Sequence, residues 1–192
     1  PARCYIMSVL TCFKAYDIRG EIGVNINQDV AYRVGRAVAQ HFEANSVVIG
    51  FDARETSPAF AKAAARGVRD AGADVLGIGM AGTEEMYWAV TELGACAGIE
   101  VTASHNPINY NGMKIVKFGS RPLDNAADFL VIKRLAESEE WGVTKSQGAE
   151  LDRTADARSA YVERVLDFID LGALKPLKIV VNSGNGAAGS TF

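Results

Sequence analysis

The chain has 192 residues, of which 48% are hydrophobic and 22% charged, and its formal net charge is −3. This composition is typical of a globular protein, long enough for one full domain and part of another. Because Lys and Arg form no basic run and no apolar stretch approaches the roughly 20 residues that span a bilayer, we expect neither nucleic-acid nor membrane binding. The three cysteines (Cys4, Cys12 and Cys96) lack metal-ligand spacing, which favours reduced thiols in the cytoplasm.

The first ten residues carry one arginine and a short mixed apolar stretch, without the core and cleavage site of a signal peptide, so we expect Pro1 to Leu10 to be a leader or a cloning remnant. From Asp29 onward, helical and strand patterns alternate. Apolar residues spaced by four predict helices, and β-branched runs such as SVVIGF (46–51) predict strands. The expected helices cover residues 29–42, 56–71, 83–93, 124–140 and 155–171, and the expected strands cover residues 46–51, 73–79, 96–102, 112–118 and 177–181.

The strands expected at 96–102 and 112–118 are separated by too few residues for a parallel crossover, which needs about a dozen. We therefore expect them to pair antiparallel. The predicted fold class is α/β, with a mixed β-sheet sandwiched between helices. One domain is expected over residues 11–150, and residues 155–192 are expected to open a second, similar domain that is truncated, because a lone strand cannot bury both of its faces. On this interpretation the chain is a fragment of a longer protein. Cys96, in an apolar stretch, is expected in the core.

A polar turn, TASHNP (102–107), directly follows one of the expected strands. Ligands of α/β folds gather at the carboxyl ends of strands, so the position suits a functional site. Ser104 offers a hydroxyl, His105 an imidazole that exchanges protons near neutral pH, and Asn106 amide donors. Alone, such a turn more often only satisfies local backbone groups. A Ser-His-Asp triad is not expected, since adjacent Ser and His side chains on one turn rarely meet.

Two further segments carry charges that suit this turn. Lys114 ends NGMK (111–114), where the return strand begins, and strand pairing would bring its ammonium alongside Ser104 to stabilise phosphate charge. Alone, a strand-edge lysine is usually only solvated. FKAYDIRG (13–20) contains Arg19 beside a glycine, which suits a two-hydrogen-bond grip on phosphate. The alternative is a structural pair between Asp17 and Arg19.

These three segments, with GTEE (82–85) and NSGNGAAG (182–189), closely resemble the α-D-phosphohexomutase superfamily, and most closely its bacterial phosphomannomutases. The segments occur in the family's order over residues 11–192, and GIEVTASHNPINYNGMKIVK (98–117) is the most specific. The resemblance implies a phosphoglucomutase-like domain I that carries the phosphoserine loop, followed by the start of domain II.

The same resemblance implies an activity. Mannose 6-phosphate and mannose 1-phosphate are interconverted through a phosphoserine and a bisphosphorylated sugar, feeding GDP-mannose synthesis, with hexose 1,6-bisphosphate as activator. Ser104 is implied to carry the phosphoryl group and to give one ligand to Mg²⁺, while His105 and Lys114 assist proton transfer. The full implied set of catalytic and substrate-binding residues is Ser104, His105, Lys114, Arg19, Tyr16 and Asn106. The implied partners are a hexose phosphate substrate and the missing domains of the parent chain.

The sequence also departs from the family. The metal loop D-G-D-x-D-R does not occur in these 192 residues, and neither do the family's sugar-recognition loop and carboxy-terminal phosphate loop. We therefore expect this chain alone not to turn over hexose phosphate. Two alternatives stay open. One is phosphoglucomutase or dual-specificity phosphohexomutase activity, because the residues that choose between the epimers lie outside this chain. The other is a non-catalytic, truncated domain that binds phosphate or a partner.

A glycine pattern at 184–189 (GNGAAG) follows an expected strand and matches the dinucleotide fingerprint G-x-G-x-x-G. Confirmation needs a following helix and an acidic residue about 20 positions later, and the sequence ends first. A tight turn from strand to helix is the better interpretation.

Overall fold

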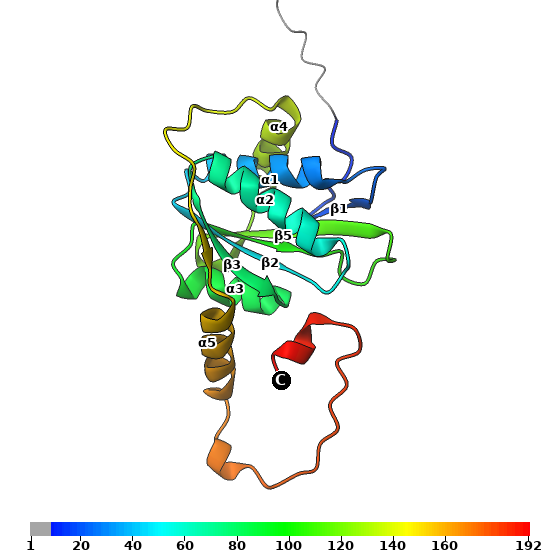
Figure 1. The fold of residues 1–192 in the computed structure, drawn as a ribbon, viewed down its shortest axis with the longest axis vertical. Coiled ribbons are helices and arrows are strands. Elements are labelled where there is room, and N and C mark those ends of the chain that lie inside the picture. Colours follow the sequence, from blue (N-terminus) through cyan, green and yellow to red (C-terminus); the bar gives the residue numbers. More distant parts are fainter. Residues whose placement is uncertain (1–8) are drawn as a thin grey trace, which may run out of the picture.

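The computed structural model of the protein describes residues 9–192 and shows a β-sheet between layers of helices (Figure 1). The strands are β1 (Ile18–Glu21), β2 (Ser46–Phe51), β3 (Asp74–Met80), β4 (Ala97–Val101), β5 (Tyr110–Lys117), β6 (Arg121–Pro122) and β7 (Glu150–Asp152). The α-helices are α1 (Gln28–His41), α2 (Ser57–Asp70), α3 (Thr83–Glu92), α4 (Leu130–Ser138) and α5 (Thr154–Leu166). The predicted α/β class is confirmed.

The seven-stranded sheet has the order β1-β5-β4-β2-β3-β7, with β6 paired to β5. Strands β4, β2, β3 and β7 run parallel, whereas β5 runs antiparallel to both β4 and β1. The antiparallel return from β4 to β5, with Ile99 opposite Ile115, is the pairing that the short gap predicts. The sheet is therefore mixed, as expected.

Helices cover both faces of the sheet (Figure 1). Because successive side chains of a strand point to opposite faces, β2 feeds two cores: Val47 and Ile49 pack with α1, α2 and α4, whereas Val48 packs with α3. The start of α5 joins the second core through the buried Ala157. Within the described residues, no helix is long and apolar enough to cross a membrane.

The predicted helices at 29–42, 56–71 and 83–93 agree with α1, α2 and α3 to within one residue at each end. The segment expected to be one helix at 124–140 differs. It begins with a π-helical turn (Asn125–Phe129) and continues as α4, and Asp124 caps the turn by accepting a 2.7 Å hydrogen bond from the Ala127 N–H. Between the helices expected at 124–140 and 155–171, where no strand is predicted, the structure has β7, a short strand at the sheet edge.

The strand expected at 177–181 is wrong, because the structure has no strand there. Leu177 is 78% exposed and Val180 is 92% exposed, and no strand of the described residues lies beside them to pair with their backbone. The preceding helix ends at Leu166 rather than at residue 171, and the chain finishes in a 3-10 turn (Ala187–Ser190). The division into domains at 11–150 and 155–192 stays a prediction.

Two expectations about the amino-terminal half need correction. Leu10, assigned to a leader, is 6% exposed in the core, and its N–H donates a 2.8 Å hydrogen bond to Glu137. The rest of the expected leader, up to residue 8, lies outside the described residues. Cys12, not Cys96, is the fully buried thiol, and burial raises the pKa of Cys12 to about 11. Such a thiol stays protonated and unreactive.

Candidate functional site

Ser104 lies in a tight turn just beyond the carboxyl end of β4. A 3.0 Å hydrogen bond from the N–H of Asn106 to the carbonyl of Ala103 closes the turn. Ser104 has a φ of 52°, in the left-handed region, which costs a residue with a side chain about 1–2 kcal/mol. The turn therefore holds backbone strain at the residue that the family motif assigns to phosphate.

The Ser104 hydroxyl lies 3.2 Å from Nδ1 of His105, and both side chains are exposed. The expectation that these adjacent side chains do not meet is therefore wrong. The left-handed backbone at Ser104 changes the relative directions of the Ser104 and His105 side chains. The behaviour of neighbouring side chains in ordinary turns therefore does not apply here. No carboxylate of the described residues is hydrogen-bonded to His105, so the pair is not a Ser-His-Asp triad.

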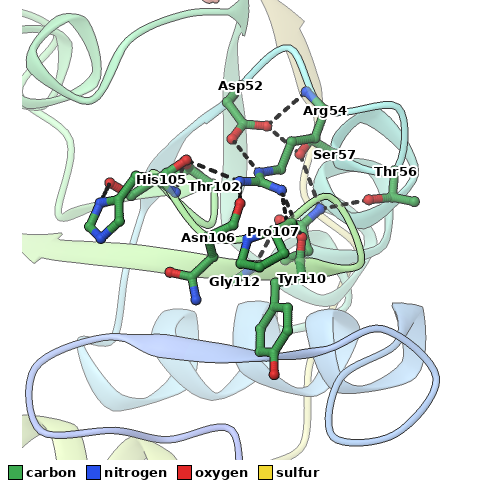
Figure 2. Close-up of polar contacts among 12 residues, drawn as sticks. Asp52, Arg54, Thr56, Ser57, Thr102, His105, Asn106, Pro107, Tyr110 and Gly112 are labelled. Carbon is green, nitrogen blue, oxygen red and sulfur yellow. Dashed lines mark hydrogen bonds and ion pairs between the residues drawn. The ribbon is translucent and has the colours of Figure 1, made fainter.

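Arg54 holds the whole turn through four backbone carbonyls (Figure 2). Its Nη1 donates to the carbonyls of Pro107 at 2.9 Å and Tyr110 at 3.2 Å. Its Nη2 donates to those of Ser104 at 3.0 Å and Asn106 at 2.6 Å. The side chain is only 11% exposed. Since the Ser104 N–H also donates to the Thr102 hydroxyl at 2.9 Å, both backbone groups of the serine are fixed.

Asp52 in turn holds Arg54. Its Oδ2 lies 3.4 Å from Nε of Arg54, and its Oδ1 accepts hydrogen bonds from the Arg54 N–H at 3.0 Å and the Ser57 hydroxyl at 2.6 Å. The sequence analysis missed both residues. The available signal was their position: two charged residues directly after a buried central strand lie at the carboxyl edge of the sheet, beside the end of β4.

The asparagine of NGMK has a structural role. Asn111 is fully buried, and its Nδ2 donates to the hydroxyls of Thr56 at 2.9 Å and Ser57 at 3.1 Å, which ties β5 to the start of α2. Thr56, the residue before α2, makes no side-chain capping bond and accepts from Asn111 instead. Gly112 is required by packing, because a Cβ there would lie 2.1 Å from the Ile18 carbonyl oxygen of β1.

Arg19 connects this turn to the amino-terminal segment. Its Nη1 donates to Oδ1 of Asn106 at 2.8 Å, and its Nη2 donates to Oδ2 of Asp17 at 2.6 Å. The expected Asp17–Arg19 pair is therefore present, and the same guanidinium reaches the turn. The side chain of Arg19 remains 19% exposed, so an anion can still approach it.

Four of the six expected site residues line two cavities: Ser104 and Asn106 line one, and Tyr16 and Lys114 line the other. The serine cavity, of about 420 Å³, is lined by Asp52, Arg54, Glu100, Thr102, Ser104 and Asn106, with Gly82 and Thr83 at the start of α3. The lysine cavity, of about 580 Å³, is lined by Tyr16, Asp17, Tyr87 and Lys114, among others. Ser104, His105, Asn106 and Arg19 thus form one connected group. Lys114 and Tyr16 line the lysine cavity, and Lys114 lies opposite Glu100 in the β4–β5 ladder.

Metal binding needs several hard ligands at one point, such as carboxylates around Mg²⁺. Among residues 9–192, no group of three or more His, Cys, Asp or Glu side chains is arranged to hold a metal ion. The side chains of the described residues therefore do not by themselves form a magnesium site around Ser104.

The loop that carries the dinucleotide pattern lies at the serine cavity, where Asn185, Gly186 and Ala187 form part of the lining. Among the described residues, no strand ends directly before this loop, and a 3-10 turn follows it in place of a full helix. The strand-to-helix context that a dinucleotide site needs is thus not found in the described part of the chain.

The model of the family "Phosphoglucomutase/phosphomannomutase, alpha/beta/alpha domain I" matches residues 11–141. The chain belongs to this family. A phosphomannomutase of Salmonella montevideo is 49% identical to it over 183 residues, which are 95% of this chain and 40% of that protein. A protein of Xanthomonas campestris pv. campestris strain B100, named "Phosphohexose mutases", is 43% identical over 180 residues, which are 94% of this chain and 40% of that protein.

The fold is shared with a solved member of the phosphoglucomutase/phosphomannomutase family from Burkholderia thailandensis. The TM-score is 0.79 at 34% identity, and the match covers 94% of this chain and 40% of the other. The chain thus spans about two fifths of the length of the relatives it matches, and the family assignment explains the mixed sheet and the serine turn together.

Proposed function

We propose that the chain is the phosphoserine-bearing part of a phosphomannomutase, which interconverts mannose 6-phosphate and mannose 1-phosphate through a bisphosphorylated sugar. The observation that carries the proposal is the Ser104 turn: a strained serine with an exposed hydroxyl, fixed at the carboxyl end of β4 by Arg54. The name of the Salmonella relative supports the choice of substrate. A cytoplasmic location, a role in GDP-mannose supply and activation by hexose 1,6-bisphosphate belong to the same proposal.

The residues of the turn suit phosphoryl transfer. The P–O bond to the Ser104 oxygen breaks as a P–O bond to the sugar hydroxyl forms. The proton of that hydroxyl passes to His105, and His105 returns a proton to the Ser104 oxygen. Its Nδ1 supports this relay, because it lies 3.2 Å from the Ser104 hydroxyl. The second half of the reaction reverses these steps with the other phosphate of the bisphosphorylated sugar.

Positive charge near the turn stabilises the phosphoryl group. A phosphoserine carries a charge of about −1.5 to −2 at neutral pH. Arg19 contacts the turn through Asn106, and Lys114 lines the lysine cavity. Phosphoryl transfer depends mainly on such positioning and charge stabilisation. The remaining contacts to the sugar and to Mg²⁺ are assigned in this proposal to the rest of a longer protein.

The test uses the longer protein to which the proposal assigns this chain. Mass spectrometry should find a phosphate on the Ser104 peptide, and Ser104→Ala should lower mannose 6-phosphate turnover by at least about a thousandfold. His105→Gln, which leaves the Ser104 hydroxyl in place, is the matched control and should keep Ser104 phosphorylatable while slowing transfer. Full turnover by Ser104→Ala would contradict the proposal.

A second candidate is a dual-specificity phosphohexomutase, which the broader name of the Xanthomonas relative favours. The ratio of kcat/KM for mannose 1-phosphate to that for glucose 1-phosphate separates the two. A ratio far above one supports the mannose enzyme, and a ratio near one supports dual specificity.

We also propose that the 192-residue chain alone is inactive, because the described residues form no metal site and the family's metal loop does not occur in the sequence. The purified chain, freed of host mutase, should give no mannose 1-phosphate in a coupled assay. Detectable turnover that disappears in Ser104→Ala would contradict this. A non-catalytic phosphate-binding domain is supported instead if the longer protein neither turns over hexose phosphate nor carries phosphate on Ser104.

A further inference from the structure

Glu100 is a buried carboxyl at the centre of the sheet, in β4, and lines the serine cavity. It is 1% exposed, and neither carboxyl oxygen has a hydrogen-bond partner among the described residues. Buried carboxyls of this kind are rare, because burial without a partner costs several kcal/mol for the charged form. Packing of the fold does not require a carboxyl at this position, since an apolar side chain of the same size would avoid that cost.

A glycine makes room for this carboxyl. Gly50 of β2 lies directly beside Glu100 in the parallel register. A Cβ at Gly50 would lie 2.3 Å from Oε2 of Glu100 and 3.1 Å from Cδ1 of Ile78. The carboxyl therefore occupies the space that any side chain at position 50 would fill. It leans toward β2, and hence away from β5 on the other side of β4.

Lys114 lies on that other side. It is paired in register with Glu100 in the antiparallel β4–β5 ladder, so the two side chains share one face of the sheet. Cβ atoms of directly opposed residues lie about 4.5–5.5 Å apart, close enough for a Glu–Lys pair. Yet no hydrogen bond or ion pair joins them, and within the described residues the Lys114 ammonium has no such partner. It lines the lysine cavity with Tyr16 and Asp17.

The surroundings of Glu100 favour its uncharged form. Burial is the largest cause that raises its pKa well above the usual range, and repulsion from nearby carboxylates adds to the rise. Lys114 opposes it. The titratable groups that face Glu100 come from the end of β2, from α3 and from β5, and they are Asp52, Glu84, Glu85, Tyr87 and Lys114. An uncharged carboxyl attracts an ammonium only weakly, which agrees with the unpaired lysine.

We propose that Gly50 is a positioning residue for Lys114: because it gives the Glu100 carboxyl room over its own backbone, it leaves the Lys114 ammonium unpaired and available to a phosphoryl group on Ser104. The part that concerns the phosphoryl group rests on the proposed function. The part that concerns Glu100, Gly50 and Lys114 rests on the geometry of three adjacent strands. Gly50, two strands away from Lys114, thus determines whether the Lys114 ammonium is paired with Glu100.

The test displaces the carboxyl. Gly50→Ala fills the space above β2, and Gly50 has no left-handed φ that would exclude alanine. The displaced Glu100 carboxylate turns toward the cavity, becomes ionised and pairs with Lys114. We expect acetylation of Lys114 in the full 192-residue chain, followed by peptide mass spectrometry, to be about threefold to fivefold slower than in the unsubstituted chain, because a paired ammonium loses its proton less readily. Lys62 on α2 is the internal control.

Glu100→Gln is the matched variant, since it keeps the shape of the side chain and removes its charge. In the unsubstituted background it should leave the Lys114 rate within about a factor of 1.5, and combined with Gly50→Ala it should restore the original rate. Slow acetylation that persists in the double variant would overturn the proposal, as would an unchanged rate in Gly50→Ala. Because acetylation needs no turnover, these results do not depend on the proposed function.

If Gly50→Ala does not fold, Glu100→Gln alone shows whether the Glu100 carboxyl pairs with Lys114 in the unsubstituted chain. A carboxyl that already pairs with Lys114 predicts several-fold faster acetylation in Glu100→Gln, and a carboxyl held over Gly50 predicts no change. In the longer protein, mutase activity that falls in Gly50→Ala and returns in the double variant extends the inference to phosphoryl transfer. A loss of activity that the double variant does not recover would overturn the link to phosphoryl transfer. The claim about the pairing of Lys114 would then depend on the acetylation rates alone.

Discussion

Two segments of the molecule are each held by one charge with little solvent exposure, and the two charges have opposite signs. The Ser104 turn is held by the guanidinium of Arg54, which donates to four backbone carbonyls. The segment that leads into α4 is held by the carboxylate of Asp128, whose side chain is 10% exposed. Its Oδ1 lies 3.0 Å from Nε2 of His41, and its Oδ2 accepts from Nζ of Lys117 at 2.6 Å and from the Asp124 N–H at 2.8 Å.

The partners of the two charges differ, and so does their effect on the fold. Asp128 joins charged and polar donors from α1 and β5 to the start of its own helix, so it fastens secondary-structure elements together. Arg54 binds uncharged carbonyls of one loop and keeps Ser104 in a conformation that it would not adopt alone. A charge with little solvent exposure thus stabilises packing in one region and maintains local strain in the other.

The largest effect is expected for Arg54→Ala. It removes four charge-assisted hydrogen bonds to carbonyls of the turn and the ion pair with Asp52, which should lower the free energy of unfolding by about 3 kcal/mol. Urea unfolding measures this loss, and amide hydrogen exchange should show that protection disappears first at residues 104–110. Arg54→Lys is the matched control: it keeps the charge but cannot span four carbonyls, so it should recover only part of the stability. Unchanged loop protection in Arg54→Ala would show that the turn is held by other contacts.

A smaller effect, without loss of the Ser104 turn, is expected for Asp128→Asn. Burial raises the pKa of Asp128, but hydrogen bonds from His41 and Lys117 outweigh it and lower the pKa to about 2. Because the unfolded carboxyl has a higher pKa, its contribution is complete above about pH 4 and is lost as the pH falls toward 2. Asp128→Asn should remove about 2 kcal/mol at neutral pH and flatten the stability profile between pH 4 and 2. If the free energy of unfolding of Asp128→Asn falls between pH 4 and 2 as steeply as that of the unsubstituted chain, Asp128 is not the source of this pH dependence.

The smallest effect concerns the strain itself. Ser104→Gly should be about 1 kcal/mol more stable than Ser104→Ala, because glycine adopts a positive φ without a steric cost. Both variants lack the hydroxyl, so their difference isolates the backbone term, and thermal unfolding of the pair measures it. As a control, the same pair at the exposed Ser159, in the interior of α5, should show the opposite order, since glycine destabilises a helix by about 1 kcal/mol relative to alanine. Equal stability of the two Ser104 variants would mean that the turn is not strained.

The spacing of apolar residues predicted most of the fold, because most helices and strands bury the face on which those residues recur. The run SVVIGF became β2 at the predicted residues, with β3 and β4 on its two sides. The run LKIVV at 177–181 has the same β-branched character, but it lies without a partner strand and remains exposed. A segment with high strand propensity therefore forms a strand only where partner strands lie beside it. The short strands β1 and β7 escaped prediction for the converse reason, since their pairing with β5 and β3 creates them.

The candidate site was predictable only where residues adjacent in sequence make it. The turn with Ser104, His105 and Asn106 follows from one motif, and Arg19 from another. Arg54 could not be predicted as the support of the turn, because its partners are backbone carbonyls, which every residue has. Glu100 escaped notice since its unusual state depends on the missing side chain of Gly50, a residue on another strand.

The sequence separation between Ser104 and its support has a consequence for the order of folding. Strands β4 and β5 are neighbours in sequence, so their hairpin closes a short loop and can form early. The bond from Arg54 to the Ser104 carbonyl spans 50 residues and requires β2 to lie beside β4. The serine is therefore present in every hairpin but acquires its final geometry only after the parallel core has assembled. A chain with an incomplete sheet exposes an ordinary flexible serine, so formation of the strained Ser104 turn reports that long-range folding has been completed.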